Sequence, residues 1–207
     1  MFRKLLISSI LLLSIQSNAQ RWGDFEIGPM VNFEYTSLIV SSGQKSINNQ
    51  GRIEEDWNAT GYESNFSAGL YTMFFIQERV GVGAELYYDK TTSTDFGEEN
   101  YYTSVTFLPF VNINFIESIP GLYFGAGGGI SLIQDSPDYM DLFEEEEIQD
   151  IALIGKLSAT YRFRNIITIE TGIHGDVLEV VKDRVKRNSF FLGVKIPLNR
   201  ILIDYRY

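Results

Sequence analysis

The 207-residue chain has no cysteine, only one histidine and five prolines. Without cysteine it can form no disulfide, no thiolate metal site and no lipid-bearing thiol. After its first 20 residues it also has no apolar run near the roughly 20 residues that a transmembrane helix needs. Basic residues are in deficit, with 17 Lys and Arg against 27 Asp and Glu. Because phosphates attract lysine and arginine, this balance argues against a nucleic-acid partner.

Residues 1–19 have the layout of a secretory signal peptide. Arg3 and Lys4 precede an apolar stretch over 5–15, and the small residues Ser17 and Ala19 fit a cleavage site before Gln20. The stretch is short for a retained membrane anchor, which is the less favoured alternative. Cleavage removes two positive charges and changes the net charge from −10 to −12. Residues 20–207 are then long enough for one domain.

Apolar and polar residues alternate along most of this domain, and such a period of two is typical of β-strands with one apolar and one polar face. In 25–35, Phe25, Ile27, Val31 and Phe33 alternate with residues such as Glu26. The pattern predicts strands at 24–36, 64–76, 80–89, 101–115, 121–133, 151–163 and 166–175, and an eighth that begins near Ser189. Pro109 predicts a bulge or a local gap in the fourth strand.

The lengths of the connections between these strands also alternate. Short turns follow the second, fourth and sixth strands, whereas long loops at 37–63, 90–100, 134–150 and 176–188 follow the others. Short turns at one end and long loops at the other are typical of outer-membrane barrels. We therefore predict an all-β fold, an eight-stranded antiparallel up-and-down transmembrane β-barrel, with ten strands as a weaker option.

Two interpretations of the C-terminal segment stay open. In the first, a single long last strand with a bulge near Pro197 continues to Tyr207, and an aromatic final residue slightly favours it because it resembles the terminal signal of outer-membrane barrels. In the second, the last barrel strand ends near Leu198 and a short extra segment follows.

If the apolar faces meet lipid, the polar faces line the interior. Charges in such a confined space need partners, because an unpaired buried charge is very costly. We therefore expect Glu85 and Glu170 to meet Lys156, Arg162 or Lys195. The residues predicted to point inward are Glu26, Glu34, Glu85, Asp89, Lys156, Arg162, Glu170, His174 and Lys195.

Two features raise the question of chemistry. His174, near Glu170 and Asp176, could belong to a Ser-His-acid triad such as lipid-trimming barrels carry, but no serine is marked and His174 falls on the polar face. The loop 134–150 is strongly acidic, including Glu144 to Glu147, but its spacing does not match a calcium loop. We expect a structural histidine, a solvated loop, and no catalytic residue, cofactor or metal site.

Three segments resemble a Bacteroidota family of small outer-membrane β-barrels, called outer membrane protein beta-barrel domain or PorT-like. They are LYFGAGG at 122–128, YRF at 161–163 followed by ITIETG at 167–172, and NSFFLGV at 188–194. The resemblance covers about 20–198 and implies an integral outer-membrane protein without catalytic residues to transfer. Residues 199–207 depart from it, since the family commonly ends at the last strand.

Together these observations predict a cell outer-membrane barrel with a filled polar interior and a structural, adhesion-type or accessory role through its acidic external loops. We expect a monomer that contacts outer-membrane lipids and lipopolysaccharide and uses the barrel-assembly machinery during insertion. The alternatives are a lipid-modifying enzyme that uses His174, a narrow channel, and a soluble periplasmic lipocalin-like barrel for an apolar ligand.

Overall fold

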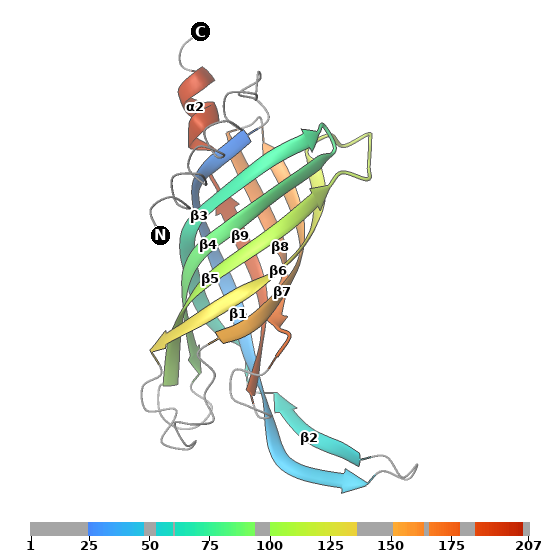
Figure 1. The fold of residues 1–207 in the computed structure, drawn as a ribbon, viewed down its shortest axis with the longest axis vertical. Coiled ribbons are helices and arrows are strands. Elements are labelled where there is room, and N and C mark those ends of the chain that lie inside the picture. Colours follow the sequence, from blue (N-terminus) through green and yellow to red (C-terminus); the bar gives the residue numbers. More distant parts are fainter. Residues whose placement is uncertain are drawn as a thin grey trace, which may run out of the picture.

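The computed structural model describes residues 25–47, 53–59, 61–93, 100–135, 151–163, 166–178 and 185–204. These residues form nine strands and a short C-terminal helix (Figure 1). In chain order the elements are β1 (Phe25–Ile47), β2 (Ile53–Ala59), β3 (Glu63–Gln77), β4 (Val80–Ser93), β5 (Asn100–Ile113), β6 (Leu122–Asp135), β7 (Ile151–Phe163), β8 (Ile167–Asp176), β9 (Val185–Lys195) and α2 (Leu198–Asp204).

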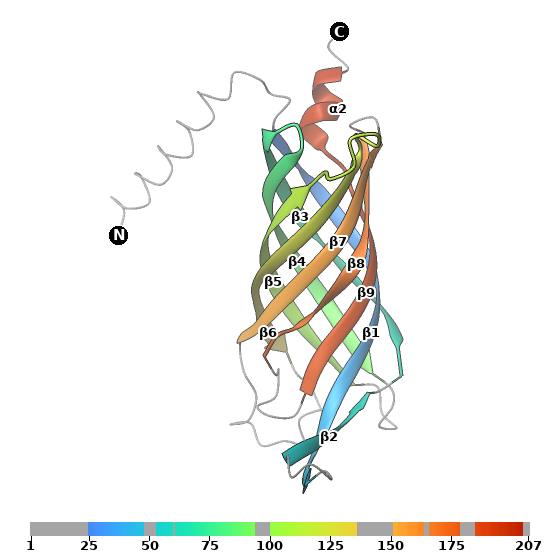
Figure 2. The same cartoon turned by 90° about the vertical axis from the view of Figure 1, so that its right-hand side faces the viewer.

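Eight of the strands close into an antiparallel barrel. Each strand from β3 to β9 pairs with the next, and β1 pairs with both β3 and β9, so the sheet has no open edge around the barrel. Figure 2 shows the strands inclined to the long axis of the barrel. The predicted eight-stranded antiparallel barrel is therefore confirmed, and the described residues do not form the ten-stranded alternative.

The first predicted strand and loop are wrong in extent. The strand does not end at residue 36, because β1 continues to Ile47, and β2 lies within the predicted loop 37–63. Beyond the last β1–β3 pair, Thr36 with Glu63, β2 takes over the same edge of β1, from Ile39 with Ala59 to Ile47 with Ile53. The two strands form a ribbon that extends beyond the barrel (Figure 1).

The strand ends that the short turns join lie at one end of the barrel, and the strand ends that the long connections join lie at the other, as predicted. The turns β3–β4, β5–β6 and β7–β8 lie at the same end as α2, which we name the turn end (Figure 1). The β1–β2 ribbon projects from the other end, the loop end. The acidic loop at 136–150 lies outside the described residues.

The long last strand favoured by the sequence is wrong, and the second interpretation holds in its main feature. β9 ends at Lys195, and residues 198–204 form α2 instead of more strand. Pro197 has no backbone N–H to donate to a ladder, which explains why strand pairing stops here. None of the helices in the described residues has the length and apolar character to cross a bilayer.

Pro109 produces a local gap rather than a bulge. Phe107 pairs with Ile130 and Phe110 with Gly127, so the β5–β6 register is the same before and after the proline. The two residues between, Leu108 and Pro109, have no partner on β6, whereas Pro109 still pairs with Ala84 on β4. The prediction of an irregularity at this proline is confirmed.

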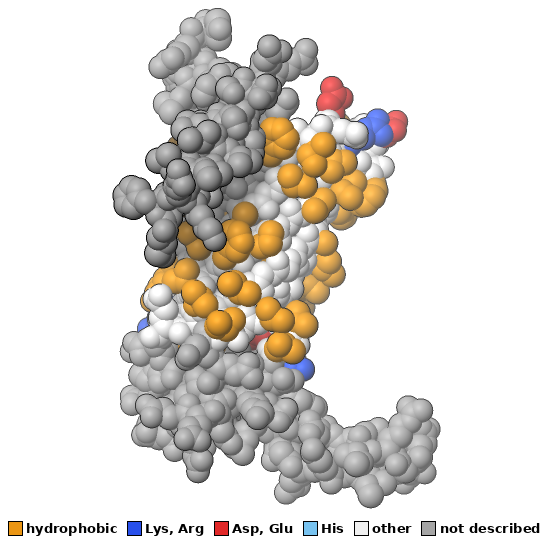
Figure 3. All heavy atoms as spheres, viewed as in Figure 1, with side chains coloured by type: hydrophobic (Ala, Val, Ile, Leu, Met, Phe, Trp, Pro, Cys, Tyr) orange, Lys and Arg blue, Asp and Glu red, His pale blue; other side chains and the backbone are white. Residues whose placement is uncertain are grey.

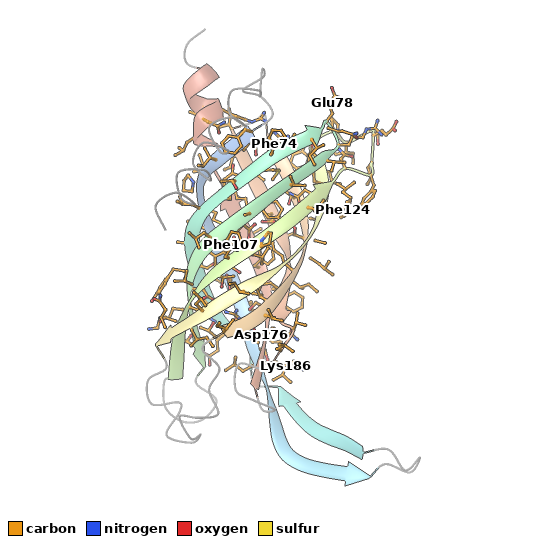
Figure 4. All side chains as sticks on the ribbon, viewed as in Figure 1. Phe74, Glu78, Phe107, Phe124, Asp176 and Lys186 are labelled. Atoms are coloured by element: carbon orange, nitrogen blue, oxygen red, sulfur yellow. The ribbon has the colours of Figure 1, made fainter. Side chains whose placement is uncertain are left out.

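The barrel is apolar outside and polar inside, the reverse of a soluble barrel. Along β3, Phe66 is 62% and Leu70 56% exposed, whereas Ser67 on the opposite face is 1% exposed. Hydrophobic side chains cover much of the visible wall in Figure 3, and charged ones lie near its ends. In Figure 4, Phe74, Phe107 and Phe124 lie on the wall between Glu78 at the turn end and Asp176 and Lys186 at the loop end.

Candidate functional site: the ionic interior

The side chains predicted to line the interior do so. Eight of the nine are buried and Arg162, near the turn end, is partly buried. They form three charge clusters along the barrel and one buried chain of hydrogen bonds through Glu34 and His174. Two further basic residues, Arg187 and Arg200, take part in the clusters.

The central cluster consists of two lysines and two glutamates from four different strands. Lys156 Nζ lies 2.6 Å from Glu85 Oε1 and 3.0 Å from Glu170 Oε2. Lys195 Nζ lies 2.6 Å from each of the same two oxygens. Each charge therefore has two opposite charges as neighbours, in a low-dielectric surrounding where ionic hydrogen bonds are strong. The expected meeting of Glu85 and Glu170 with Lys156 and Lys195 is confirmed.

Aromatic rings surround this cluster. The ammonium of Lys156 lies 4.8 Å from the ring centre of Phe191, and that of Lys195 lies 4.9 Å from the ring centre of Phe110. Both distances suit cation–π attraction, which grows when the cation is desolvated. The rings occupy the space beside the ion pairs, as expected for a barrel of eight strands whose interior is just filled by side chains.

The turn-end cluster centres on Glu26, which is fully buried on β1. Arg162 Nη2 lies 2.5 Å and Arg200 Nε 2.9 Å from Glu26 Oε1. The guanidinium of Arg162 also lies 4.3 Å from the ring centre of Phe75. Arg162 was expected as a partner of Glu85 or Glu170, but it pairs with Glu26, because it lies at the end of β7 whereas Lys156 lies mid-strand.

The loop-end cluster centres on Arg187, one of the two residues that sequence reasoning missed. Its Nη1 donates to Asp89 Oδ2, and its Nη2 lies 3.3 Å from Asp176 Oδ1. Arg187 was missed because the last strand was predicted to begin near Ser189, whereas β9 begins at Val185. The signal was present, since Arg187 has the same parity as the inward residue Ser189.

His174 belongs to a buried chain of hydrogen bonds. Its Nε2 lies 3.1 Å from Glu34 Oε2, and its Nδ1 lies 3.4 Å from the hydroxyl of Tyr87. Ser67 Oγ donates to the other oxygen of Glu34 at 2.6 Å. The acid partner is thus Glu34, rather than Glu170 or Asp176 as the sequence suggested. The imidazole faces the interior and is 4% exposed, away from the lipid-facing wall.

The charges inside the described barrel nearly balance. Six carboxylates face the interior, at Glu26, Glu34, Glu85, Asp89, Glu170 and Asp176, and five lysine or arginine side chains, at Lys156, Arg162, Arg187, Lys195 and Arg200. His174 also lies in this interior, where its Nε2 is 3.1 Å from Glu34 Oε2.

An ion pair of a different kind lies outside the barrel, between two of the short turns. Arg79 Nη1 donates to Glu117 Oε1, and both side chains are exposed. This hydrogen bond raises the pKa of Arg79 and lowers the pKa of Glu117. Exposed pairs contribute little to stability, so the buried clusters matter more for the fold.

No protein-family model matches the sequence, and no curated protein matches it. Solved structures of similar fold include the following three. Neisserial surface protein A matches 82% of this chain and 97% of its own, at 12% identity and a TM-score of 0.47. Ail of Yersinia pestis, solved with the heparin analogue sucrose octasulfate, matches 84% of this chain and 98% of its own, at 12% identity and a TM-score of 0.43. OprG of Pseudomonas aeruginosa, an outer membrane protein, matches 83% of this chain and 94% of its own, at 9% identity and a TM-score of 0.35.

At these identities no ligand or role passes from those proteins to this chain. The resemblance to the PorT-like family stays a prediction. Among the described residues, no group of three or more histidine, aspartate or glutamate side chains is arranged to hold a metal ion. The feature that carries a functional argument is thus the interior itself: three charge clusters stacked inside an apolar wall.

Proposed function

We propose that this protein is an integral outer-membrane β-barrel with a filled, non-conducting interior that holds the β1–β2 ribbon and the long connections at the cell surface. The observation that carries the proposal is the reversed polarity of the barrel. Exposed apolar side chains cover the wall, and buried charged side chains fill the interior. Lipid stabilises such a wall, whereas water would leave a large apolar surface exposed.

The aromatic residues on the wall support this position. Towards the loop end, Tyr35 stacks on Tyr62 at 5.1 Å between ring centres, and near the turn end Tyr161 packs edge-on against Phe163 at 5.1 Å. Aromatic girdles at both membrane interfaces are typical of outer-membrane barrels. In this orientation the short turns and α2 face the periplasm, and the ribbon faces outward. Export by the signal peptide 1–19 is part of the same proposal.

The role that we assign to the protein is structural, adhesion-type or accessory, and it is exerted by the outward segments. Lipopolysaccharide and other outer-membrane lipids contact the wall, the barrel-assembly machinery acts during insertion, and the protein is a monomer. A lipid-modifying activity is disfavoured because His174 faces the interior and contacts Glu34. A lipocalin-like site for an apolar ligand is disfavoured because charged side chains occupy the interior.

Fractionation of cells that express the full chain tests this proposal. The folded protein should require detergent for extraction from the outer-membrane fraction, and its mobility on a gel should change on boiling. Recovery in the soluble periplasmic fraction without detergent would contradict it and favour the lipocalin-like alternative. Planar-bilayer recordings test the filled interior, and we expect no steps of conductance above that of the bare bilayer. Reproducible steps would favour the narrow channel.

A charge placed on the wall should destabilise the inserted barrel. Leu70 lies mid-strand on β3 and is 56% exposed, so Leu70→Lys puts an ammonium into hydrocarbon. We expect a loss of about 2–4 kcal/mol in the free energy of unfolding from lipid vesicles. Glu78→Lys, in the exposed turn after β3, is the matched control and should change this free energy by less than about 0.5 kcal/mol. Equal effects of the two variants would place Leu70 outside the bilayer.

A further inference from the structure

We propose that α2 holds the start of β1 in place at the turn end, where β9 has already ended. We call the junction between β1 and β9 the seam, and this role of α2 the latch. The inference goes beyond the proposed function, because it concerns how the first and last segments of the barrel are held together. It rests on the residues that join α2 to the first residues of β1, at the turn end.

The β9 ladder stops short of the start of β1. The last pair is Met30 with Lys195, followed by a single backbone hydrogen bond of 3.1 Å from Ile196 N to Pro29 O. The first residues of β1, from Phe25 to Gly28, pair with β3 on one side and have no β9 partner on the other. Their backbone groups on the seam side therefore need another partner.

The side chain of Asn199 provides that partner. Its Nδ2 donates to Phe25 O at 2.7 Å, and its Oδ1 accepts from Ile27 N at 3.1 Å. An amide side chain has one donor group and one acceptor group, so Asn199 alone supplies the two bonds to Phe25 O and Ile27 N that two different residues of a longer antiparallel β9 would supply. The segment 197–200, which contains Asn199, is itself closed by a hydrogen bond, because Arg200 N donates to the carbonyl of Pro197 at 3.1 Å.

Two further contacts hold the helix in place. Arg200 Nε lies 2.9 Å from the buried Glu26, so α2 also supplies a charge to the turn-end cluster. Gly28 lets the chain pass closely over β1, because a Cβ at this position would collide with the carbonyl of Ile196. The latch thus consists of two side-chain hydrogen bonds from Asn199, an ionic contact from Arg200 and a close backbone approach at Gly28.

Hydrogen exchange of single amides in detergent micelles tests the latch. In Asn199→Ala the amide of Ile27 loses its acceptor, so we expect it to exchange roughly three- to tenfold faster, as the net value of one hydrogen bond implies. The amide of Leu70, in the middle of β3, should not change. Leu198→Ala, a change at an exposed side chain of the same helix, is the matched control and should leave Ile27 unchanged.

Unchanged exchange at Ile27 in Asn199→Ala would overturn the latch. A second variant, Gly28→Ala, keeps Asn199 but forces the chain at Ile196 away, and it should also speed exchange at Ile27. If Asn199→Ala does not fold, Gly28→Ala alone carries the test, and unchanged exchange at Ile27 in that variant would overturn the latch. These outcomes are independent of extraction and conductance, which test the proposed function.

Discussion

Lys195→Met should lower the free energy of unfolding of the barrel by about 3–5 kcal/mol, the cost of breaking a buried ion pair by removal of one partner. Lys195 is fully buried and contacts Glu85 and Glu170 at 2.6 Å each. Without it, two buried carboxylates share the single ammonium of Lys156. The expected loss exceeds that of most single substitutions because the remaining negative charge cannot reach water.

The measurement is urea-induced unfolding from lipid vesicles, followed by the heat-dependent gel shift. Lys90→Met, at an exposed position on β4, is the matched control and should change the free energy by less than about 0.5 kcal/mol. A partial rescue in Lys195→Met/Glu85→Gln, which again leaves one carboxylate for one ammonium, would assign the loss to charge imbalance. No rescue would assign it to the altered packing around the aromatic rings instead.

The barrel class could be predicted from the sequence because one pattern sets both its topology and its polarity. Alternation determines which side chains share a face, and the sorted loop lengths indicate which connections lie at the same end. These two signals were enough to place Glu26 and Glu34 in the interior. They were also enough to expect lysine partners for Glu85, since confined charges must balance.

Two of the partners could not be predicted, those of Arg162 and His174, because contacts across the barrel join strands that are distant in the sequence. The alternation assigns Arg162 to the interior, but it does not give the position of Arg162 along the barrel axis. That position depends on the inclination of the strands. Its partner is therefore Glu26 instead of Glu85 or Glu170. His174 is a similar case, since its acid partner lies 140 residues away, at Glu34.

The prediction for the segment after β9 was wrong for another reason. The alternation of Ile201 and Ile203 fits a strand as well as a short helix, and a pattern over so few residues does not separate the two. Tertiary contacts decide the outcome: Pro197 cannot continue the ladder, and Asn199 and Arg200 find their partners on β1 only if the chain turns into α2. No local propensity contains that information.

Arg187→Leu should be as costly as the loss of Lys195, about 3–5 kcal/mol. Arg187 is 1% exposed and bridges Asp89 and Asp176, so its removal leaves two buried carboxylates without their shared cation. Its backbone N–H, which donates to Asp176 Oδ2 at 2.9 Å, remains in the variant. The expected loss therefore comes from the guanidinium alone.

Lys186→Leu is a demanding control for this prediction, because it removes the same kind of charge one residue earlier on the same strand. Successive side chains of a strand point to opposite faces, so Lys186 belongs to the outer face and its replacement should cost less than about 0.5 kcal/mol. Unfolding from lipid vesicles measures both variants, and Asp89→Asn should restore part of the stability lost in Arg187→Leu. Equal losses at 186 and 187 would mean that β9 does not have the register that places Arg187 inside, and the loop-end cluster would have to be reassigned.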